Sequence, residues 1–292
     1  MPPCLFASDL HGRKDRYLKL FAAIEAERPG AVFLGGDLLP SGFGLAGSGV
    51  GQCEPDDDAG FVRGFLWEHL SRLRTALGAS YPAVFAVLGN DDLRVEEEAA
   101  REIDGLGLWH YAHNRRAEWD GFWIYGYSCV PPTPFRLKDW ERYDVSRFVD
   151  PGCCSPEDGW RTVAVDAHDV RYGTIEGDLE ALTQGADLSR AILLFHAPPY
   201  GTALDRAALD GRFVDHVPLD VHVGSIAIQR FILRRSPLVT LHGHVHESAR
   251  LTGAWRATVG TTHALSAAHE GPELALVRFD PCCPAEATRT LI

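Results

Sequence analysis

The sequence predicts an α/β protein, and two regularities support this fold class. Short apolar runs of strand length alternate with longer segments in which apolar residues recur at helical spacing. Several of the short runs end in Gly, Asp, Asn or His, and open α/β sheets place their ligand sites at the carboxyl ends of their strands. Hydrophobic residues make up 46% of the chain and charged residues 23%, a composition that excludes a disordered or fibrous protein.

The first half of the chain contains the clearest strand and helix patterns. A strand at residues 5–8 precedes a helix at 15–27, which Pro29 and Gly30 end. Apolar residues fall on one face of this helix, as expected if it covers a sheet. The elements that follow are a strand at 31–37, a long surface loop at 41–60, a helix at 61–77 and a strand at 83–90.

The second half continues the alternation around one irregular segment. Residues 129–165 lack clear periodicity and are predicted to be an insertion or lid over one face. The last residues, 281–292, are predicted to be an irregular tail, and residues 1–280 one domain, because no repeat or linker interrupts them. The other predicted elements are antiparallel strands that turn near Asp120–Gly121, helices at 175–183 and 225–234, and strands at 191–196, 238–244, 255–259 and 274–279.

Charge and cysteine content limit the classes of partner. The chain has 292 residues and a net charge of −12, which makes long nucleic acid or an anionic membrane an unfavourable partner. It has no apolar run of 18 residues and its first residues do not resemble a secretory signal, so we expect no membrane span and a cytoplasmic protein. The seven cysteines show no metal-ligand spacing.

Five polar clusters directly follow predicted strands. G-H-x-H is the most informative, since 29 Gly and 13 His give only about 0.06 chance occurrences in a chain of this length. D-x-H alone is uninformative, because about one is expected by chance. The clusters are SDLHG with Asp9 and His11, GGDLL with Asp37, LGNDD with Asn90, Asp91 and Asp92, FHAPP with His196, and HGHVH with His244 and His246.

Together these side chains have the chemistry of a dinuclear metal site. Carboxylate, imidazole and amide oxygen ligands without a thiolate suit Mn²⁺, Fe or Zn²⁺. Two ions about 3.5–4 Å apart need a bridging carboxylate, and they can clamp both oxygens of a phosphoryl transfer. Because residues i and i+2 of a strand point to opposite faces, His244 and His246 can both bind metal only in a turn, which Gly243 permits.

The ordered set D-x-H, G-D, G-N-x-D, H and G-H-x-H resembles the calcineurin-like metallophosphoesterases and spans residues 9 to 246. The resemblance implies two mixed β-sheets packed as a sandwich and flanked by helices, with the metals at the strand ends. It implies hydrolysis of a phosphoester by a metal-bound hydroxide, with two divalent ions, manganese first and iron or zinc as alternatives. Carried over to this sequence, the first ion has Asp9, His11 and His246 as ligands, the second has Asn90, His196 and His244, and Asp37 bridges them.

The sequence departs from the family pattern at one position. Members often have a His directly after the motif Asn, where it contacts the phosphate and protonates the leaving oxygen, and here that residue is Asp91. An ordinary aspartate is ionised at pH 7, so it repels a dianionic monoester more than a monoanionic diester. We therefore expect a preference for phosphodiesters of small molecules or nucleotides, with Asp91 in a catalytic role. The alternative is that Asp91 pairs with Arg94.

Three further residues are candidates for the site. Asp92 is a second catalytic candidate, with capping of the short helix that follows as the alternative. Tyr200, in HAPPYG, and His222, directly before a predicted helix whose N-terminus suits an anion, are candidates for the substrate pocket.

Two other functions fit the same sequence. One is a phosphomonoesterase, including a protein phosphatase. The other is a non-catalytic scaffold that binds metal and presents an interaction surface, although such a protein is expected to have lost ligands. The expected partner is a small-molecule phosphoester, and the sequence does not indicate an oligomeric state.

Overall fold

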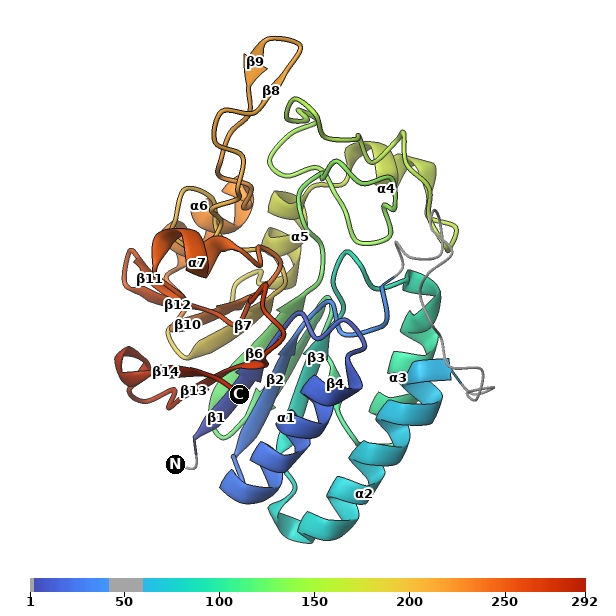
Figure 1. Ribbon diagram of the computed structural model, residues 1–292, viewed down its shortest axis with the longest axis vertical. Helices are drawn as coiled ribbons and strands as arrows, with labels where there is room; N and C mark the ends of the chain where they lie inside the picture. Colours follow the sequence, from blue (N-terminus) through green and yellow to red (C-terminus); the bar gives the residue numbers. More distant parts are fainter. Residues whose placement is uncertain (1–2, 42–59) are drawn as a thin grey trace.

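The computed structural model describes residues 3–41 and 60–292, in which two six-stranded mixed sheets face each other (Figure 1). In the first sheet the order is β14-β13-β1-β2-β3-β4, and the four strands from β1 to β4 run parallel. β13 is antiparallel to β1, and β14 is antiparallel to β13. The strands are β1 (Cys4–Ala7), β2 (Ala31–Gly35), β3 (Ala83–Val87), β4 (His110–Tyr111), β13 (Ala275–Phe279) and β14 (Thr288–Leu291).

The second sheet has the order β11-β12-β10-β7-β6-β5. Its four inner strands are parallel, and an antiparallel strand lies at each edge. The predicted hairpin with its turn at Asp120–Gly121 is confirmed as β5 and β6. The strands are β5 (Arg115–Trp119), β6 (Phe122–Tyr127), β7 (Ala191–Phe195), β10 (Val239–His242), β11 (Arg256–Val259) and β12 (Thr262–Ser266).

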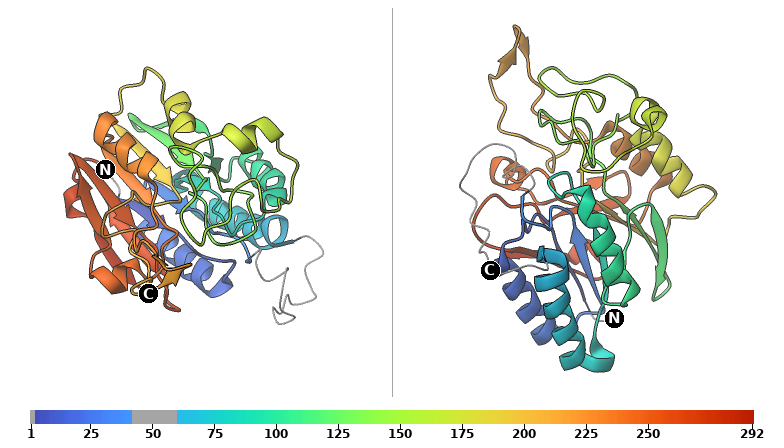
Figure 2. Two further views of the ribbon diagram at one scale, coloured as in Figure 1. Left: turned by 90° about the horizontal axis from the view of Figure 1, so that it is seen from above. Right: turned by 90° about the vertical axis from the view of Figure 1, so that its right-hand side faces the viewer.

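Helices cover the outer faces of the sheets, so the molecule has four layers (Figures 1 and 2). Side chains alternate along each strand, and in β1 Phe6 enters the core between the sheets while Leu5 packs on the helix side. The helices are α1 (Lys14–Glu27), a π turn (Val62–Leu66) that leads into α2 (Trp67–Leu77), α3 (Glu97–Gly105), α4 (Ala167–Tyr172), α5 (Ile175–Leu182), α6 (Ile226–Arg235) and α7 (Ser248–Thr252). The predicted sandwich flanked by helices is confirmed.

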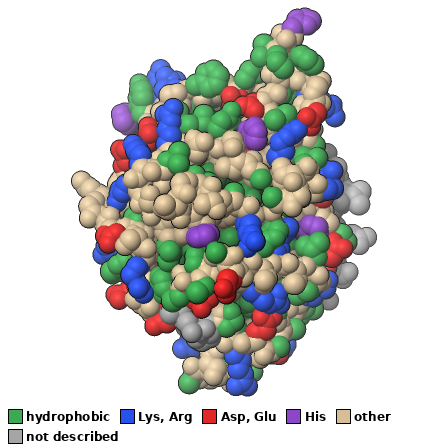
Figure 3. All heavy atoms as spheres, turned by 90° about the vertical axis from the view of Figure 1, so that its left-hand side faces the viewer, with side chains coloured by type: hydrophobic (Ala, Val, Ile, Leu, Met, Phe, Trp, Pro, Cys, Tyr) green, Lys and Arg blue, Asp and Glu red, His purple; other side chains and the backbone are tan. Residues whose placement is uncertain are grey.

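Residues 129–165 follow β6 as loops that lie beyond the strand ends (Figure 1). Hydrogen bonds attach these loops to the segment after β3: the indole of Trp140 donates to the carbonyl of Asp92, and Asp139 accepts a hydrogen bond from the amide of Arg94. A small hairpin, β8 (Phe213–Val214) with β9 (Val217–Pro218), projects beside them (Figure 1). Hydrophobic side chains cluster near its end (Figure 3), where Phe213 is 62% exposed.

The C-terminal prediction is wrong. Residues 281–292 are not an irregular tail, because Thr288–Leu291 pairs with β13 as the edge strand β14. The β-branched threonines suit such a strand, but the preceding Pro and Cys residues obscure the pattern. The strand β12 was not predicted from the sequence either. The predicted loop at 41–60 falls, apart from its two end residues, outside the described residues. Within the described ranges, no helix is long and apolar enough to cross a membrane.

Candidate metal centre

The seven predicted ligands follow five parallel strands, and the strands bring them to one place. β1, β2 and β3 are parallel in one sheet, and β7 and β10 are parallel in the other, so their carboxyl ends lie at the same end of the sandwich. Hydrogen bonds join the two sheets there. Nδ1 of His196 donates to the carbonyl of Gly35 at 2.7 Å, and the amide of His244 donates to Asp9 at 2.9 Å.

Four of the side chains form a tight first group. One ligand atom from each of Asp9, His11, Asp37 and His246 lies within 4.8 Å of all the others. Nε2 of His246 is 3.2 Å from Oδ1 of Asp9 and 3.2 Å from Nε2 of His11. These are the residues expected at the first ion, together with the expected bridge.

The remaining ligands lie on the other side of Asp37. Nε2 of His196 is 3.3 Å from Oδ2 of Asp37 and 3.1 Å from Oδ1 of Asn90. The same Asp37 oxygen is 3.9 Å from Nε2 of His11, so this carboxylate faces both groups, as a bridging ligand must. The ring of His244 is 5.2 Å from that of His196, and His244 lies in the predicted turn after β10.

The backbone at the site is strained. Asp9, His11, Asp37 and His244 have φ between 48° and 74°, the left-handed region that residues other than glycine rarely adopt. Each such residue costs on the order of 1 kcal/mol or more, and residues of this kind cluster at functional sites. Four of the seven predicted ligands therefore have a backbone conformation that costs free energy.

Glycines make room for the ligands. A Cβ on Gly89 would lie 2.3 Å from Oδ1 of Asp37 and 2.6 Å from Nε2 of His196. A Cβ on Gly36 would lie 2.5 Å from Nδ1 of His196, and one on Gly243 would lie 2.7 Å from Oδ2 of Asp9. The close approach of these glycines explains the Gly in three of the five motifs.

The carboxylates are buried and have histidines as their ion-pair partners. Asp9 is 0% and Asp37 3% exposed, and no salt bridge from Lys or Arg reaches either one in the described part of the chain. Burial alone would raise the pKa of Asp9, but the hydrogen bond and charge of His246 lower it to about 2. Burial would likewise raise the pKa of Asp37, but the charge and hydrogen bond of His196 hold it well below the usual range.

The same charges also shift the pKa values of the histidines. Burial would lower the pKa values of His11 and His196, but the neighbouring carboxylates raise both to about 9. His244 differs, because burial and then the charge of His196 lower its pKa to about 3, which keeps its imidazole neutral and able to act as a ligand. Carboxylate and amide oxygens together with imidazole nitrogens are ligands that suit divalent cations, so the residues fit the two ions that the motifs imply.

Asp91 lies at the edge of this group. Oδ2 is 3.0 Å from Nδ1 of His11, and Oδ1 accepts the hydroxyl of Ser41 at 2.9 Å. Its amide donates to Asp37 at 2.8 Å. Arg94, the alternative partner, forms an ion pair with Glu97. Because Nδ1 of His11 donates a hydrogen bond to this carboxylate, Nε2 of that histidine is left to face the metal group.

Asp92 has a different position. It is fully buried and accepts the amides of Leu38, Leu39 and Gly89 at 2.7 to 3.0 Å. Burial and the charge of Asp37 raise its pKa to about 7. It does not cap the following helical turn, which has no side-chain cap. Its position does not support direct contact with substrate, and it holds the loops after β2 and β3 together instead.

Tyr200 and His222 lie beside each other, with ring centroids 5.9 Å apart. The hydroxyl of Tyr200 donates to Asp220, whose other oxygen accepts the amide of His222. The anion site expected at the helix after His222 is already filled, because Asp144 accepts the hydroxyl of Ser225 and the amide of Ile226 there.

Two buried polar residues next to the predicted ones were not predicted from the sequence. Ser8 donates to Oδ2 of Asp9 at 2.5 Å and so orients that carboxylate. Asp205 is 0% exposed and binds Nδ1 of His222 at 2.8 Å. A serine beside the motif Asp was a visible signal for the first, whereas nothing in the segment LDRAALD marked Asp205 as a partner of His222.

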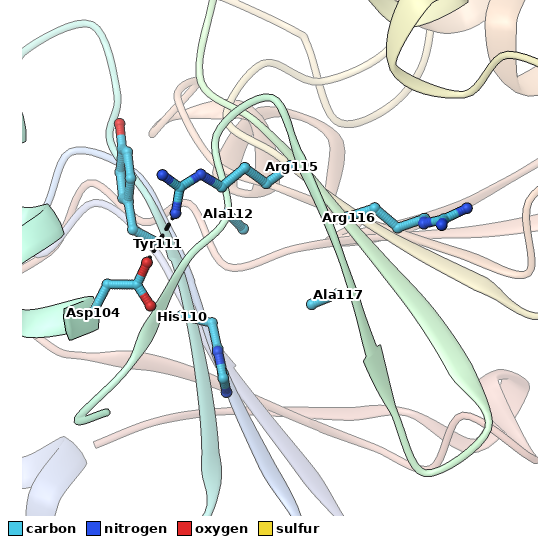
Figure 4. Close-up of a pocket in the computed structure, with 7 residues that line it drawn as sticks. All are labelled: Asp104, His110, Tyr111, Ala112, Arg115, Arg116 and Ala117. Atoms are coloured by element: carbon cyan, nitrogen blue, oxygen red, sulfur yellow. Dashed lines mark hydrogen bonds and ion pairs between the residues drawn. The ribbon is translucent and has the colours of Figure 1, made fainter. Parts of the chain in front are cut away.

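A separate cavity of about 210 Å³ is lined by residues of α3, β4 and β5 and of the segment between these two strands (Figure 4). Its polar side chains diverge in Figure 4, where Arg115 reaches Asp104 and Arg116 points away. It contains none of the seven ligands and is not a candidate for the catalytic site.

The fold and the site define a class: an α/β sandwich with a cluster of Asp and His side chains at its strand ends that could hold metal ions. The sequence matches the family described as Calcineurin-like phosphoesterase over residues 2–248. The chain belongs to this family, whose members are metal-dependent phosphoester hydrolases that typically bind two divalent ions.

Solved structures give the same fold at low identity. One crystal structure is 18% identical with a TM-score of 0.58, and TT1561 of Thermus thermophilus is 15% identical with a TM-score of 0.56. Each alignment covers 99% of this chain and 98% of the other. A structure described as a novel archaeal phosphodiesterase is 11% identical with a TM-score of 0.42 over 99% of both chains, too distant for a functional argument. No curated protein matches.

Proposed function

We propose that this protein is a phosphodiesterase that hydrolyses phosphodiesters of small molecules or nucleotides with two divalent ions, Mn²⁺ first among them. The cytoplasmic location expected from the sequence is part of the same proposal. Divalent ions held by the seven side chains would supply the positive charge that neutralises a phosphate and activates water for attack. The chain's own residues set the geometry: Asp37 faces both groups, and the carbonyl of Gly35 fixes the ring of His196.

Asp91 is the observation that carries the diester preference. It stands where many members have a proton-donating His, and its carboxylate accepts from His11 and Ser41. It therefore adds negative charge at the metal group and offers no proton to a leaving oxygen. A dianionic monoester loses more from this charge than a monoanionic diester does.

The first experiment compares bis(4-nitrophenyl) phosphate with 4-nitrophenyl phosphate, in Mn²⁺ and after chelation. We expect metal-dependent turnover that is faster on the diester. Replacing Asp91 with His is expected to lower the diester-to-monoester ratio of kcat/KM at least tenfold, and Asp91→Asn separates loss of charge from gain of a donor.

Other outcomes point to the alternatives. A faster monoester, or an unchanged ratio in Asp91→His, would refute the argument from Asp91 and favour a phosphomonoesterase or protein phosphatase. Less than one bound ion per chain, with no thermal stabilisation by Mn²⁺, would favour the scaffold, because a ligand that binds only the folded state must stabilise it.

A further inference from the structure

A short ribbon made of residues 205–208 and 221–223 adjoins two loops that carry metal ligands. The amide of Ala207 donates to the carbonyl of Val221 at 2.8 Å, and the backbones of Arg206 and His222 pair antiparallel. The amide of Ala208 donates to Glu247, the residue directly after His246, at 3.1 Å. This bond attaches the ribbon to the loop after β10.

The loop after β7 holds the other side of the ribbon. Tyr200 lies four residues after His196, and its amide donates to Ser225 at 3.0 Å. Asp205 accepts the amides of Gly201 and Thr202, each at 2.9 Å, so the ribbon begins directly against this loop. The ribbon therefore lies between the segments that follow His196 and His246, at the border of the metal group.

His222 is held in the ribbon by one ring nitrogen only. Its Nδ1 is 2.8 Å from Oδ1 of Asp205, which also accepts the amide of Gly224 through Oδ2 at 3.2 Å. A carboxylate with these donors can only accept, so Nδ1 carries the hydrogen. Nε2 then points away from Asp205, and no hydrogen bond within the described residues occupies it. The side chain is 33% exposed.

Two other histidines show what a structural histidine looks like in this protein. Both ring nitrogens of buried His242 are bonded, to the carbonyl of Ala197 and the hydroxyl of Thr240, each at 2.8 Å. His113 is buried beneath Trp140 and accepts the amide of Ser128. His222 is fixed on one side and open on the other, which is the arrangement of an acid–base histidine oriented by a carboxylate.

We propose that His222, oriented by Asp205, protonates the leaving oxygen of the phosphoester. This inference rests on the proposed function and names the residue that does what Asp91 cannot. As the bond between phosphorus and the leaving oxygen breaks, that oxygen keeps the electron pair and takes the proton of Nε2. Water adds its oxygen to phosphorus and gives up a proton, which restores His222. The balance is ester and water to a phosphomonoester and an alcohol. Asp205 is a positioning residue.

The test uses the full chain with Mn²⁺ and a pair of diesters that differ in the leaving group. Methyl 4-nitrophenyl phosphate releases a stable phenolate that needs no proton, whereas methyl phenyl phosphate releases a more basic oxygen. His222→Gln keeps a donor toward Asp205 but removes the acid. We expect kcat to fall about 100-fold or more on the phenyl ester and less than about fivefold on the nitrophenyl ester. Asp205→Asn is expected to show the same selectivity with a smaller loss.

Controls separate this role from damage to the metal group. His168→Gln makes the same change at an exposed histidine on α4 and is expected to alter neither rate. Metal content and the Mn²⁺-dependent rise in Tm are expected to be unchanged in His222→Gln. Equal losses on both esters, or loss of bound metal, would overturn the proposal.

Failure of the proposal for His222 can be distinguished from failure of the proposed function. If the unaltered protein prefers monoesters, the diester proposal fails, and the leaving-group comparison is repeated on phenyl and 4-nitrophenyl phosphate with the same expectation for His222→Gln. If the unaltered protein shows no metal-dependent turnover of any of these esters, both proposals fail.

Discussion

Gly89→Ala is the sharpest test of the metal centre, because it adds one methyl group and removes no ligand. The new Cβ would lie 2.3 Å from Oδ1 of Asp37, 2.5 Å from its backbone nitrogen and 2.6 Å from Nε2 of His196. Ordinary contacts begin near 3.4 Å, so Asp37 or the chain at residue 89 must move by about 1 Å. The backbone at Asp37 cannot yield easily, since Asp91 and Asp92 bind this loop.

The size of the effect follows from linkage. Disturbing groups that only support metal ligands costs about 10–100-fold in affinity, and here two ligands are displaced directly, so we expect a loss of about 100-fold or more. At a Mn²⁺ concentration 1,000 times the original Kd, bound metal stabilises the unaltered protein by about 4.1 kcal/mol and the variant by about 1.4 kcal/mol. For a chain of 292 residues, whose unfolding entropy is about 0.6 kcal/mol/K, this difference corresponds to about 4 °C in the metal-dependent rise of Tm.

The assay measures Tm with Mn²⁺ and after chelation, and counts bound ions per chain. Taking the difference for each variant cancels any effect of the methyl group on the metal-free fold. Gly105→Ala is the matched control, because nothing lies within 4 Å of its Cβ at the end of α3 and alanine favours a helix by about 0.5–1 kcal/mol. An unchanged metal-dependent rise in Gly89→Ala would refute the placement of Asp37 and His196 as ligands.

Three further predictions concern stability. Burial, with the nearby charge of Arg94, lowers the pKa of His113 to about 3, so folding excludes a proton that the unfolded chain binds below pH 6.5. His113 should therefore lower the free energy of unfolding by about 1.4 kcal/mol per pH unit as the pH falls from 6.5 toward 3. In denaturant unfolding, His113→Gln should lose less stability over this pH range than the unaltered protein; an equal dependence on pH would contradict the lowered pKa. Asp144→Ala removes the acceptor at the start of α6 and is expected to cost about 1–3 kcal/mol in urea unfolding, whereas a change below about 0.5 would show that Ser225 suffices. Lys138→Met leaves fully buried Glu141 without its cation and is expected to cost about 3–5 kcal/mol, most of it recovered on adding Glu141→Leu; a mild single variant would show that Thr133 alone satisfies the carboxylate.

The elements that could be predicted from the sequence are mostly helices with one buried face and strands with both faces buried, because these leave a clear apolar pattern. Apolar runs such as AILLF and AVFAV, followed by Gly or His, identified inner parallel strands because both faces of these strands are buried. The inner strand β12 was missed although it is buried, because its sequence THALS contains no continuous apolar run. The edge strand β14 and the hairpin of β8 and β9 were missed. Their residues are half exposed and short, so local pattern does not distinguish them from loops, and only pairing with a neighbour defines them.

The residues of the site could be predicted from the chemistry of their side chains and from their position after predicted strands. The order of the five motifs selected seven residues that the structure brings together across two sheets. The sequence does not predict where these side chains point. Asp92 turns to the backbone, Asp91 turns to His11, and Asp205 is buried against His222. These orientations depend on hydrogen bonds between loops far apart in the chain, which a local pattern does not contain.

The left-handed backbone at Asp9, His11, Asp37 and His244 makes the stability of the fold compete with metal binding. Glycine at any of these positions would relieve strain on the order of 1 kcal/mol and remove a ligand at the same time. A directed-evolution campaign that rewarded only heat resistance in a chelating medium would therefore erase the metal centre early. Stabilised variants of this protein should be selected with the metal present. The free energy of metal binding then compensates for the cost of the left-handed backbone at these residues.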